Sequence, residues 1–231
     1  MDNIKGIIFD LDGTLADTLP LCIKSFQLAF EEITGIKHPE STIIKYFGQT
    51  EEGITKSIAP ECWEDCFNAY IRIYKENHHL CPAIFDGTRE ILDFLRENHY
   101  KIAMVTGKGK PTADISLDYF GIKNYFEFVE TGSAEGVIKD KCMAKILNQW
   151  QIPANQVIYI GDQPSDITCS RKAGVLPIAV TWASTTNSEL LEKENPYKIF
   201  SKTEDFKDWL EEITESKLTS QNTLPATNAG L

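Results

Sequence analysis

Short apolar runs that stop at a polar turn constrain the fold of this chain more than any other feature. The first run covers residues 4–9 and stops at Asp10. Three later runs behave in the same way, at 102–105, 157–160 and 177–181. Unbroken apolar runs of this length are typical of parallel strands buried on both faces, and helical periodicity separates them at 91–95 and 142–150. The alternation predicts an α/β fold with a Rossmann-like, doubly wound parallel sheet.

Residues 18–81 interrupt this alternation. Apolar residues at helical spacing predict helices within 19–33 and 63–74, and the stretch contains no convincing strand. We therefore expect a helical domain inserted into the sheet domain. After residue 183 we expect a short edge strand near Ile199 and a final helix through 206–213. The resulting division is 1–17 and 82–215 for the sheet domain, 18–81 for the insertion and 216–231 for a disordered tail.

The composition restricts the partners of the chain. Its formal net charge is −11 at pH 7, whereas surfaces that bind nucleic acids or anionic membranes are rich in Lys and Arg. We therefore expect neither partner, while a small anionic substrate needs only a few local cations. The six cysteines lack the spacing of zinc or disulfide frameworks, and the chain lacks a signal peptide and a membrane-length apolar run. These features favour reduced thiols and a cytoplasmic location.

Two aspartates lie at the end of the first apolar run. Asp10 and Asp12 flank Leu11, and Gly13 follows them. At a strand end this spacing lets both carboxylates approach one point while the glycine lets the chain turn away sharply. Two anions held so close are stabilised by a divalent cation, and Mg²⁺ suits carboxylate oxygens combined with a substrate phosphate. The same residues also occur in ordinary polar turns, so the other strand ends must decide between the two interpretations.

The second run is followed by a hydroxyl, a glycine and a cation. Thr106 and the backbone N–H of Gly107 can meet the oxygens of an anion, and Lys108 can neutralise its charge. Parallel strands deliver such groups to one edge of the sheet, where open α/β sheets bind their ligands. The alternative is that Thr106 caps a helix and that Lys108 is solvated.

Two further acids follow the run at 157–160. Asp162 comes directly after Gly161 and adds a third carboxylate to the same edge. Repulsion among Asp10, Asp12 and Asp162 requires a compensating metal ion. Asp166 lies four residues further on, and its alternative role is to cap the helix that follows.

Taken in order, these motifs resemble those of the haloacid dehalogenase-like hydrolase superfamily. Residues 10–18, Asp-Leu-Asp-Gly-Thr-Leu-Ala-Asp-Thr, match its first motif in full, and the resemblance extends from about residue 4 to 213. It is strongest to the phosphoglycolate-phosphatase-like and pyrophosphatase-like branch, whose α-helical cap is inserted after the first motif. The resemblance thus implies that the insertion at 18–81 is a cap on a catalytic core.

The resemblance also implies roles for the motif residues. Asp10 would be the nucleophile that forms an aspartyl-phosphate, and Asp12 the general acid and then the base. Both, with Asp162 and Asp166, would form or support a Mg²⁺ site. Thr106 and Gly107 would hold the phosphate oxygens. A lysine before the helix at 142–150 would neutralise them: the register of related sequences favours Lys139, and Lys141 stays the alternative.

Several functions stay open within this resemblance. Asp12 favours a phosphate ester or anhydride over a halide as substrate, because a halide leaves without protonation. We expect a Mg²⁺-dependent phosphatase that acts on a small, phosphoglycolate-like metabolite. The alternatives are a pyrophosphatase, a β-phosphoglucomutase-like phosphotransferase and, more remotely, a receiver-like signalling module. Gly48 falls where related caps contact the leaving group, although an ordinary interhelix turn explains it equally well.

Overall fold

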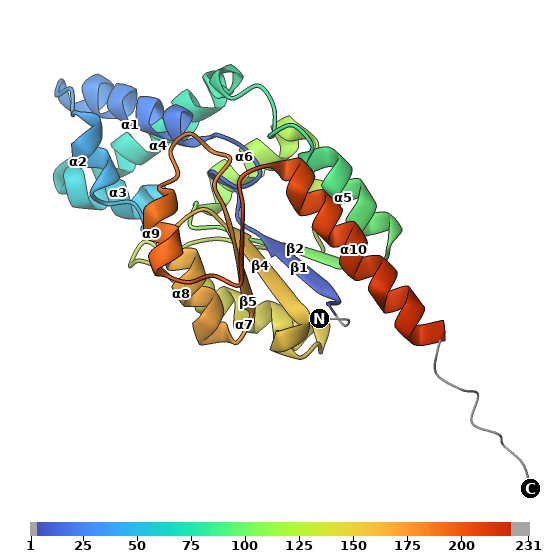
Figure 1. Cartoon of the computed structure of the whole chain (residues 1–231). Coiled ribbons are helices and arrows are strands. Elements are labelled where there is room, and N and C mark those ends of the chain that lie inside the picture. The colour runs from blue at the N-terminus through green and yellow to red at the C-terminus, as the bar shows by residue number, and fades with distance from the viewer. Residues whose placement is uncertain (1–3, 223–231) are drawn as a thin grey trace, which may run out of the picture.

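Six parallel strands form one sheet at the centre of the computed structural model, which describes residues 4–222 (Figure 1). They are β1 (Gly6–Phe9), β2 (Lys101–Val105), β3 (Phe128–Glu130), β4 (Val157–Gly161), β5 (Leu176–Val180) and β6 (Lys198–Phe200). Their order is β3-β2-β1-β4-β5-β6, and every neighbouring pair is parallel. This doubly wound order reverses direction at β1 and β4, and it confirms the predicted fold class.

Helices cover both faces of the sheet because alternate residues of each strand point to opposite sides. In β1, Ile7 and Phe9 belong to a buried cluster on one face of the sheet. Ile8 belongs to a buried cluster on the other face. The first face is covered by α5 (Thr88–Glu97), α6 (Lys110–Phe120) and α10 (Thr203–Asn222). The second is covered by α7 (Lys139–Trp150) and α8 (Pro164–Ala173), and α9 (Ser188–Lys193) contacts α8.

The strands expected from the four apolar runs are present as β1, β2, β4 and β5, and the edge strand near Ile199 is β6. The sequence does not predict β3. This strand has three residues, all of them half-buried, at the opposite edge of the sheet. So short a segment, covered on only part of its surface, carries too little apolar signal to be recognised from the sequence.

Four α-helices lie together beyond one end of the sheet (Figure 1). They are α1 (Leu19–Thr34), α2 (Glu40–Ile44), α3 (Glu51–Ile58) and α4 (Trp63–Glu76). α1 and α4 pack through aromatic side chains, with the rings of Phe26 and Tyr70 stacked 4.0 Å apart. Their buried residues continue into the cluster on the first face of the sheet, and the hydroxyls of Tyr74 and Ser116 form a 2.8 Å hydrogen bond between α4 and α6. Single 3₁₀ turns occur at 60–62, 78–80, 123–125 and 154–156.

The final helix, α10, extends further than the sequence predicts. Residues 216–222 were expected in a disordered tail but form the last turns of α10. The hydroxyls of Ser216 and Thr219 donate to the carbonyls of Glu212 and Glu215, four residues earlier, so the polar residues that suggested disorder are compatible with the helix. The rest of the expected tail, 223–231, lies outside the described residues.

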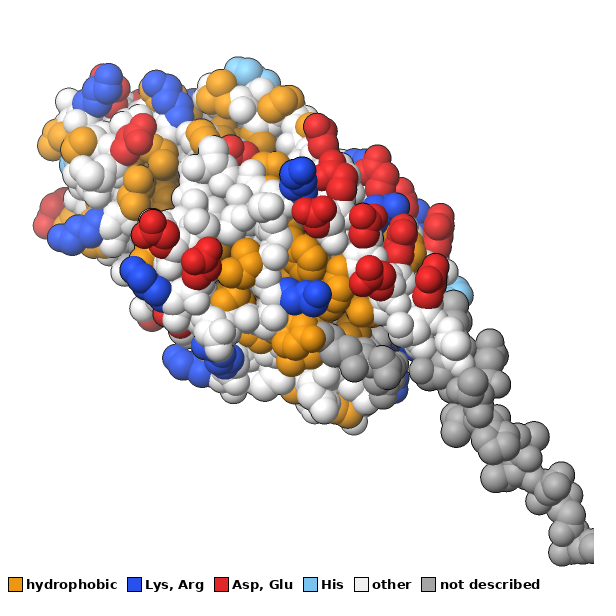
Figure 2. Space-filling view, in the orientation of Figure 1, with side chains coloured by type: hydrophobic (Ala, Val, Ile, Leu, Met, Phe, Trp, Pro, Cys, Tyr) orange, Lys and Arg blue, Asp and Glu red, His pale blue; other side chains and the backbone are white. Residues whose placement is uncertain are grey.

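Acidic side chains gather along α10 (Figure 2).

The cysteines and the helices bear on the expectations of free thiols and of no membrane span. All six cysteines are free thiols. The Sγ atoms of Cys62 and Cys66 lie 3.9 Å apart, which is too far for a disulfide bond. Among the described residues, no helix combines the length and the apolar character needed to cross a membrane.

The docking of α10 gives a first prediction. Leu210 is fully buried in the cluster beneath α10, whereas Leu190 on α9 is 45% exposed. Leu210→Ala removes buried apolar contacts and leaves a cavity, so it should lower the free energy of unfolding by about 2–5 kcal/mol. The same change at Leu190 should alter that free energy by less than about 0.5 kcal/mol. Urea denaturation of both variants measures the difference, and equal effects would contradict the packing described here.

Candidate active site

Two adjacent strands bring Asp10 and Asp162 to the same edge of the sheet. Asp10 follows β1 and Asp162 follows β4, and the backbone N–H of Asp10 donates to the carbonyl of Ile160 at 2.9 Å. Both aspartates are almost fully buried. This is the position where the strand order reverses, which in doubly wound sheets opens a crevice for ligands.

Lys139, the first residue of α7, lies between two of the predicted acids. Its Nζ is 2.6 Å from Oδ2 of Asp10 and 2.6 Å from Oδ1 of Asp166. Burial alone would lower the pKa of Lys139, but the charges of Asp10 and then Asp166 raise it well above its ordinary value. The lysine is therefore a cation held inside the protein. Lys141, the alternative from the sequence, lies two residues further along α7 and is exposed.

Asp166 caps the helix that follows it and also contacts Lys139. As the third residue of α8, it accepts a hydrogen bond from the backbone N–H of Gln163 at 3.0 Å and so caps the helix. Its other oxygen pairs with Lys139 and accepts a 3.2 Å hydrogen bond from the hydroxyl of Tyr159. Gly161 makes this arrangement possible, because a Cβ there would overlap the carboxylate of Asp166.

The three buried carboxylates have the properties of a cation site. One oxygen from each of Asp10, Asp162 and Asp166 lies within 4.8 Å of the others. Burial, followed by the charges of Asp166 and Asp10, raises the pKa of Asp162 to about 8, and burial raises that of Asp10 to about 6 against the opposing effect of Lys139. Oδ1 of Asp162 is buried without a hydrogen-bond partner among the described residues. An all-oxygen donor set with excess negative charge fits Mg²⁺.

The carboxylate of Asp12 points to a different set of residues. Its Oδ1 accepts a hydrogen bond from the hydroxyl of Thr18 and lies 3.2 Å from Nζ of Lys108. The side chain is 18% exposed and lines the same cavity as Asp10. Thus Asp10 and Asp12 face one space, as their spacing predicts, but the carboxylate of Asp12 is not part of the three-acid cluster.

The segment after β2 is arranged around a buried lysine. Lys108 is 5% exposed, so the alternative of a solvated lysine is wrong. Its Nζ lies 3.0 Å from Sγ of Cys22, and its backbone N–H donates to the hydroxyl of Thr106 at 3.2 Å. Gly107 and Lys108 line the cavity, whereas Thr106 lies buried behind them.

One cavity of about 420 Å³ connects these groups with the helices of residues 19–76. Its floor contains Asp10, Asp12, Lys139 and Asp162, and its opposite wall comes from α1, α3 and the loop at 47–49. Gly48 lies in this wall, where a Cβ would stand 3.3 Å from Cγ2 of Val137. Gly48 therefore lines the cavity.

Glu51 is a polar residue of the cavity that sequence reasoning missed. It begins α3, and only 5% of its side chain is exposed. One carboxylate oxygen accepts the backbone N–H of Gly109 at 2.6 Å, and the other accepts the hydroxyl of Thr112 and lies 3.6 Å from Nζ of Lys108. These partners are 57 to 61 residues away in the sequence, so no local pattern could have identified them.

Comparisons with known proteins decide the family. The family model described as haloacid dehalogenase-like hydrolase matches residues 7–180. The chain belongs to this family of hydrolases. A protein provisionally named pyrophosphatase PpaX, from Caldanaerobacter subterraneus subsp. tengcongensis, is 34% identical over 199 residues, which cover 84% of this chain and 89% of that protein. The pyrophosphatase PpaX of Halalkalibacterium halodurans is 30% identical over 183 residues, covering 78% and 85% of the two chains.

Solved structures of haloacid dehalogenase-like and related proteins share the fold. SP0104 of Streptococcus pneumoniae, a haloacid dehalogenase-like family protein, has a TM-score of 0.75 at 24% identity and covers 91% of this chain and 100% of its own. A predicted phosphoglycolate phosphatase from Haemophilus somnus 129pt has a TM-score of 0.75 at 21% identity, covering 90% and 98%. The resemblance inferred from the sequence motifs is thus confirmed at the level of family and fold.

The tight turn after Asp12 gives a second prediction for this hydrolase. Gly13 has a φ of 74°, and a Cβ there would overlap the carboxylate of Asp162. Gly35 has a φ of 72° with open space around it. Gly35→Ala should therefore cost about 1–2 kcal/mol of stability from backbone strain alone. Gly13→Ala should cost about 1–3 kcal/mol more because of the overlap. Urea denaturation compares the two, and equal losses would contradict the close approach to Asp162.

Proposed function

We propose that this hydrolase is a Mg²⁺-dependent phosphatase that cleaves a small phosphorylated metabolite through an aspartyl-phosphate. The observation that carries the proposal is the pairing of Asp10 with the buried Lys139 in a cavity that also contains Asp12 and Asp162. The proposed nucleophile Asp10, the proposed acid Asp12 and the cation Lys139 thus line one cavity. Asp10 and Asp162 there would also serve as metal ligands. Phosphoryl transfer requires mainly such positioning and electrostatic stabilisation.

In the first proposed step, the carboxylate of Asp10 attacks the phosphorus atom. A bond forms between an aspartate oxygen and phosphorus while the bond from phosphorus to the ester oxygen breaks, and Asp12 donates a proton to the departing oxygen. In the second step, Asp12 takes a proton from water, which attacks the aspartyl-phosphate. Inorganic phosphate leaves and Asp10 is regenerated.

The remaining residues are proposed to bind charge. Lys139 and the backbone N–H of Gly107 would hold the equatorial phosphate oxygens, with Thr106 supporting the Gly107 segment from behind. Asp10, the backbone carbonyl of Asp12 and Asp162 would hold Mg²⁺, and Asp166 would orient Lys139. When bound, the metal supplies positive charge that neutralises the substrate phosphate. Lys108 and Gly48, which both line the cavity, would face the leaving group.

We also propose a division of labour between the two parts of the chain. Residues 1–17 and 82–215 would form the catalytic core, and residues 18–81 would act as a cap. The proposal is supported by the cavity, whose lining comes from both parts. A cap over the site excludes bulk water, which would otherwise weaken electrostatic interactions there.

The setting of the reaction follows from the same observations. We propose a cytoplasmic location with reduced thiols, which is supported by the six free cysteines. The proposed partner is a small metabolite rather than a nucleic acid or a membrane. A pyrophosphatase is the second candidate function, because two relatives at 30% identity or more carry that name.

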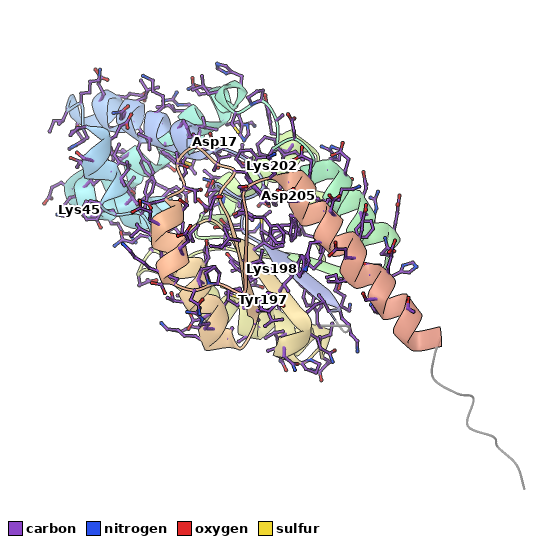
Figure 3. The ribbon with its side chains drawn as sticks, viewed as in Figure 1. Asp17, Lys45, Tyr197, Lys198, Lys202 and Asp205 are labelled. Carbon is purple, nitrogen blue, oxygen red and sulfur yellow. The ribbon has the colours of Figure 1, made fainter. Side chains whose placement is uncertain are left out.

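The role of Asp10 gives a third prediction. Asp10→Asn should lower the rate of phosphate release from an aryl phosphate at least about a thousandfold, because the amide is a poor nucleophile. Asp205→Asn, at the exposed start of α10 (Figure 3), should leave the rate unchanged. Phosphate release is measured in Mg²⁺ and again after chelation by EDTA, which should abolish activity reversibly. An active Asp10→Asn enzyme would exclude the nucleophile assignment.

The two lysines near the start of α7 give a fourth prediction. Lys139→Gln removes the cation that touches Asp10 and should lower kcat/KM about a hundredfold or more, because charge stabilisation on the phosphoryl group is lost. Lys141→Gln changes an exposed side chain and should alter kcat/KM less than twofold. Steady-state kinetics of the two folded variants distinguish them, and a larger effect at Lys141 would reverse the assignment.

A further inference from the structure

The leaving-group side of the cavity carries a further inference, which rests on the proposed phosphatase function. On the floor, Asp10 and Lys139 define where a phosphoryl group would sit. The rest of the substrate must then extend toward the helices of residues 19–76. The chemistry of that side therefore determines which leaving groups the enzyme accepts.

The wall on that side is mainly apolar. Leu19, Ile23 and Phe26 of α1 line it, together with Ile54 of α3. At the rim, Phe47 and Val137 line the cavity while remaining 36% and 48% exposed. An apolar cavity of about 150 Å³ holds benzene, so the 420 Å³ here has room for a phosphoryl group and a ring or short alkyl chain.

The cations that line the cavity already have anionic partners. Within the described part of the chain they are Lys108 and Lys139. Lys139 is held by Asp10 and Asp166, as described above. Lys108 has Asp12 at 3.2 Å and Glu51 at 3.6 Å. A second negative charge on the leaving-group side would therefore lie beside two carboxylates, of Asp12 and Glu51, and a single lysine.

Glu51 also occupies the positively polarised start of α6. The N-terminus of α6 presents the backbone N–H of Gly109, and helix N-termini attract anions. The carboxylate of Glu51 accepts that N–H and the hydroxyl of Thr112. The protein therefore fills this site with its own carboxylate, which lines the cavity and would repel a second anionic group.

We propose that Glu51 is a specificity-determining residue and that the substrate is a phosphate monoester whose leaving group is uncharged and apolar. The apolar wall binds such a group, and Glu51 rejects leaving groups that carry a carboxylate or a second phosphate. This argues against the sequence-based expectation of a phosphoglycolate-like substrate, because the leaving group of phosphoglycolate carries a carboxylate. It also disfavours pyrophosphate, whose leaving group is itself an anion.

A pair of matched substrates tests the proposal. Phosphate release is measured with 4-methylphenyl phosphate and with 4-carboxyphenyl phosphate, which differ mainly in the second negative charge. The wild-type kcat/KM should favour the methyl compound by about tenfold or more. Glu51→Gln should lower this preference about tenfold, because it removes the repelling charge and leaves Lys108 with one fewer anionic partner. Inorganic pyrophosphate should be a poor substrate of the wild-type enzyme.

The matched control is Glu52→Gln. Glu52 is the next residue of α3, is 39% exposed, and pairs with Lys56 at 2.5 Å on the surface. Its substitution should leave the preference unchanged. The preference is a ratio within one protein preparation, so partial loss of folded enzyme does not affect it. A wild-type preference for the carboxylate compound or for pyrophosphate, or equal preferences in the two variants, would overturn the role of Glu51. Absence of phosphate release from every compound would instead refute the proposed phosphatase.

Discussion

The contact of one buried lysine with two buried aspartates is the interaction on which the rest of the site depends. Lys139 joins Asp10 at the end of β1 to Asp166 at the start of α8, with both contacts at 2.6 Å. Three carboxylates without this cation would repel one another in a region shielded from water. The adjacency of β1 and β4 brings the acids together, and Gly161 leaves room for Asp166. The sheet order and the electrostatics of the site are therefore coupled.

A second charged group, formed by Asp12, Lys108 and Glu51, lines the same cavity. It differs from the first because one of its members comes from the helices of residues 19–76. Glu51 attaches α3 to the start of α6 through two hydrogen bonds. In the proposed reaction, the first group would face the phosphoryl group and the second would face the leaving group.

The inserted helices contribute apolar surface as well as charge. Their buried residues are continuous with the cluster on one face of the sheet, and the hydrogen bond between Tyr74 and Ser116 crosses the same boundary. The wall of the cavity is thus supported by the packing of both parts of the chain. Substitutions at Leu19 or Ile23 would change the shape of the cavity without touching the strand ends that carry the acids. Under the proposed function, specificity and chemistry would therefore be determined by different segments.

The sequence by itself determined the family, the fold class and which strand ends carry polar side chains. Strand periodicity and the position of Asp10, Asp12 and Asp162 directly after an apolar run are local properties, and parallel strands necessarily deliver their ends to one edge. Other features depended on packing between distant segments. The choice of Lys139 over Lys141 as the contact of Asp10, the burial of Lys108 and the position of Glu51 were decided only by the tertiary structure. Their partners lie dozens of residues away, so no local pattern encodes these contacts.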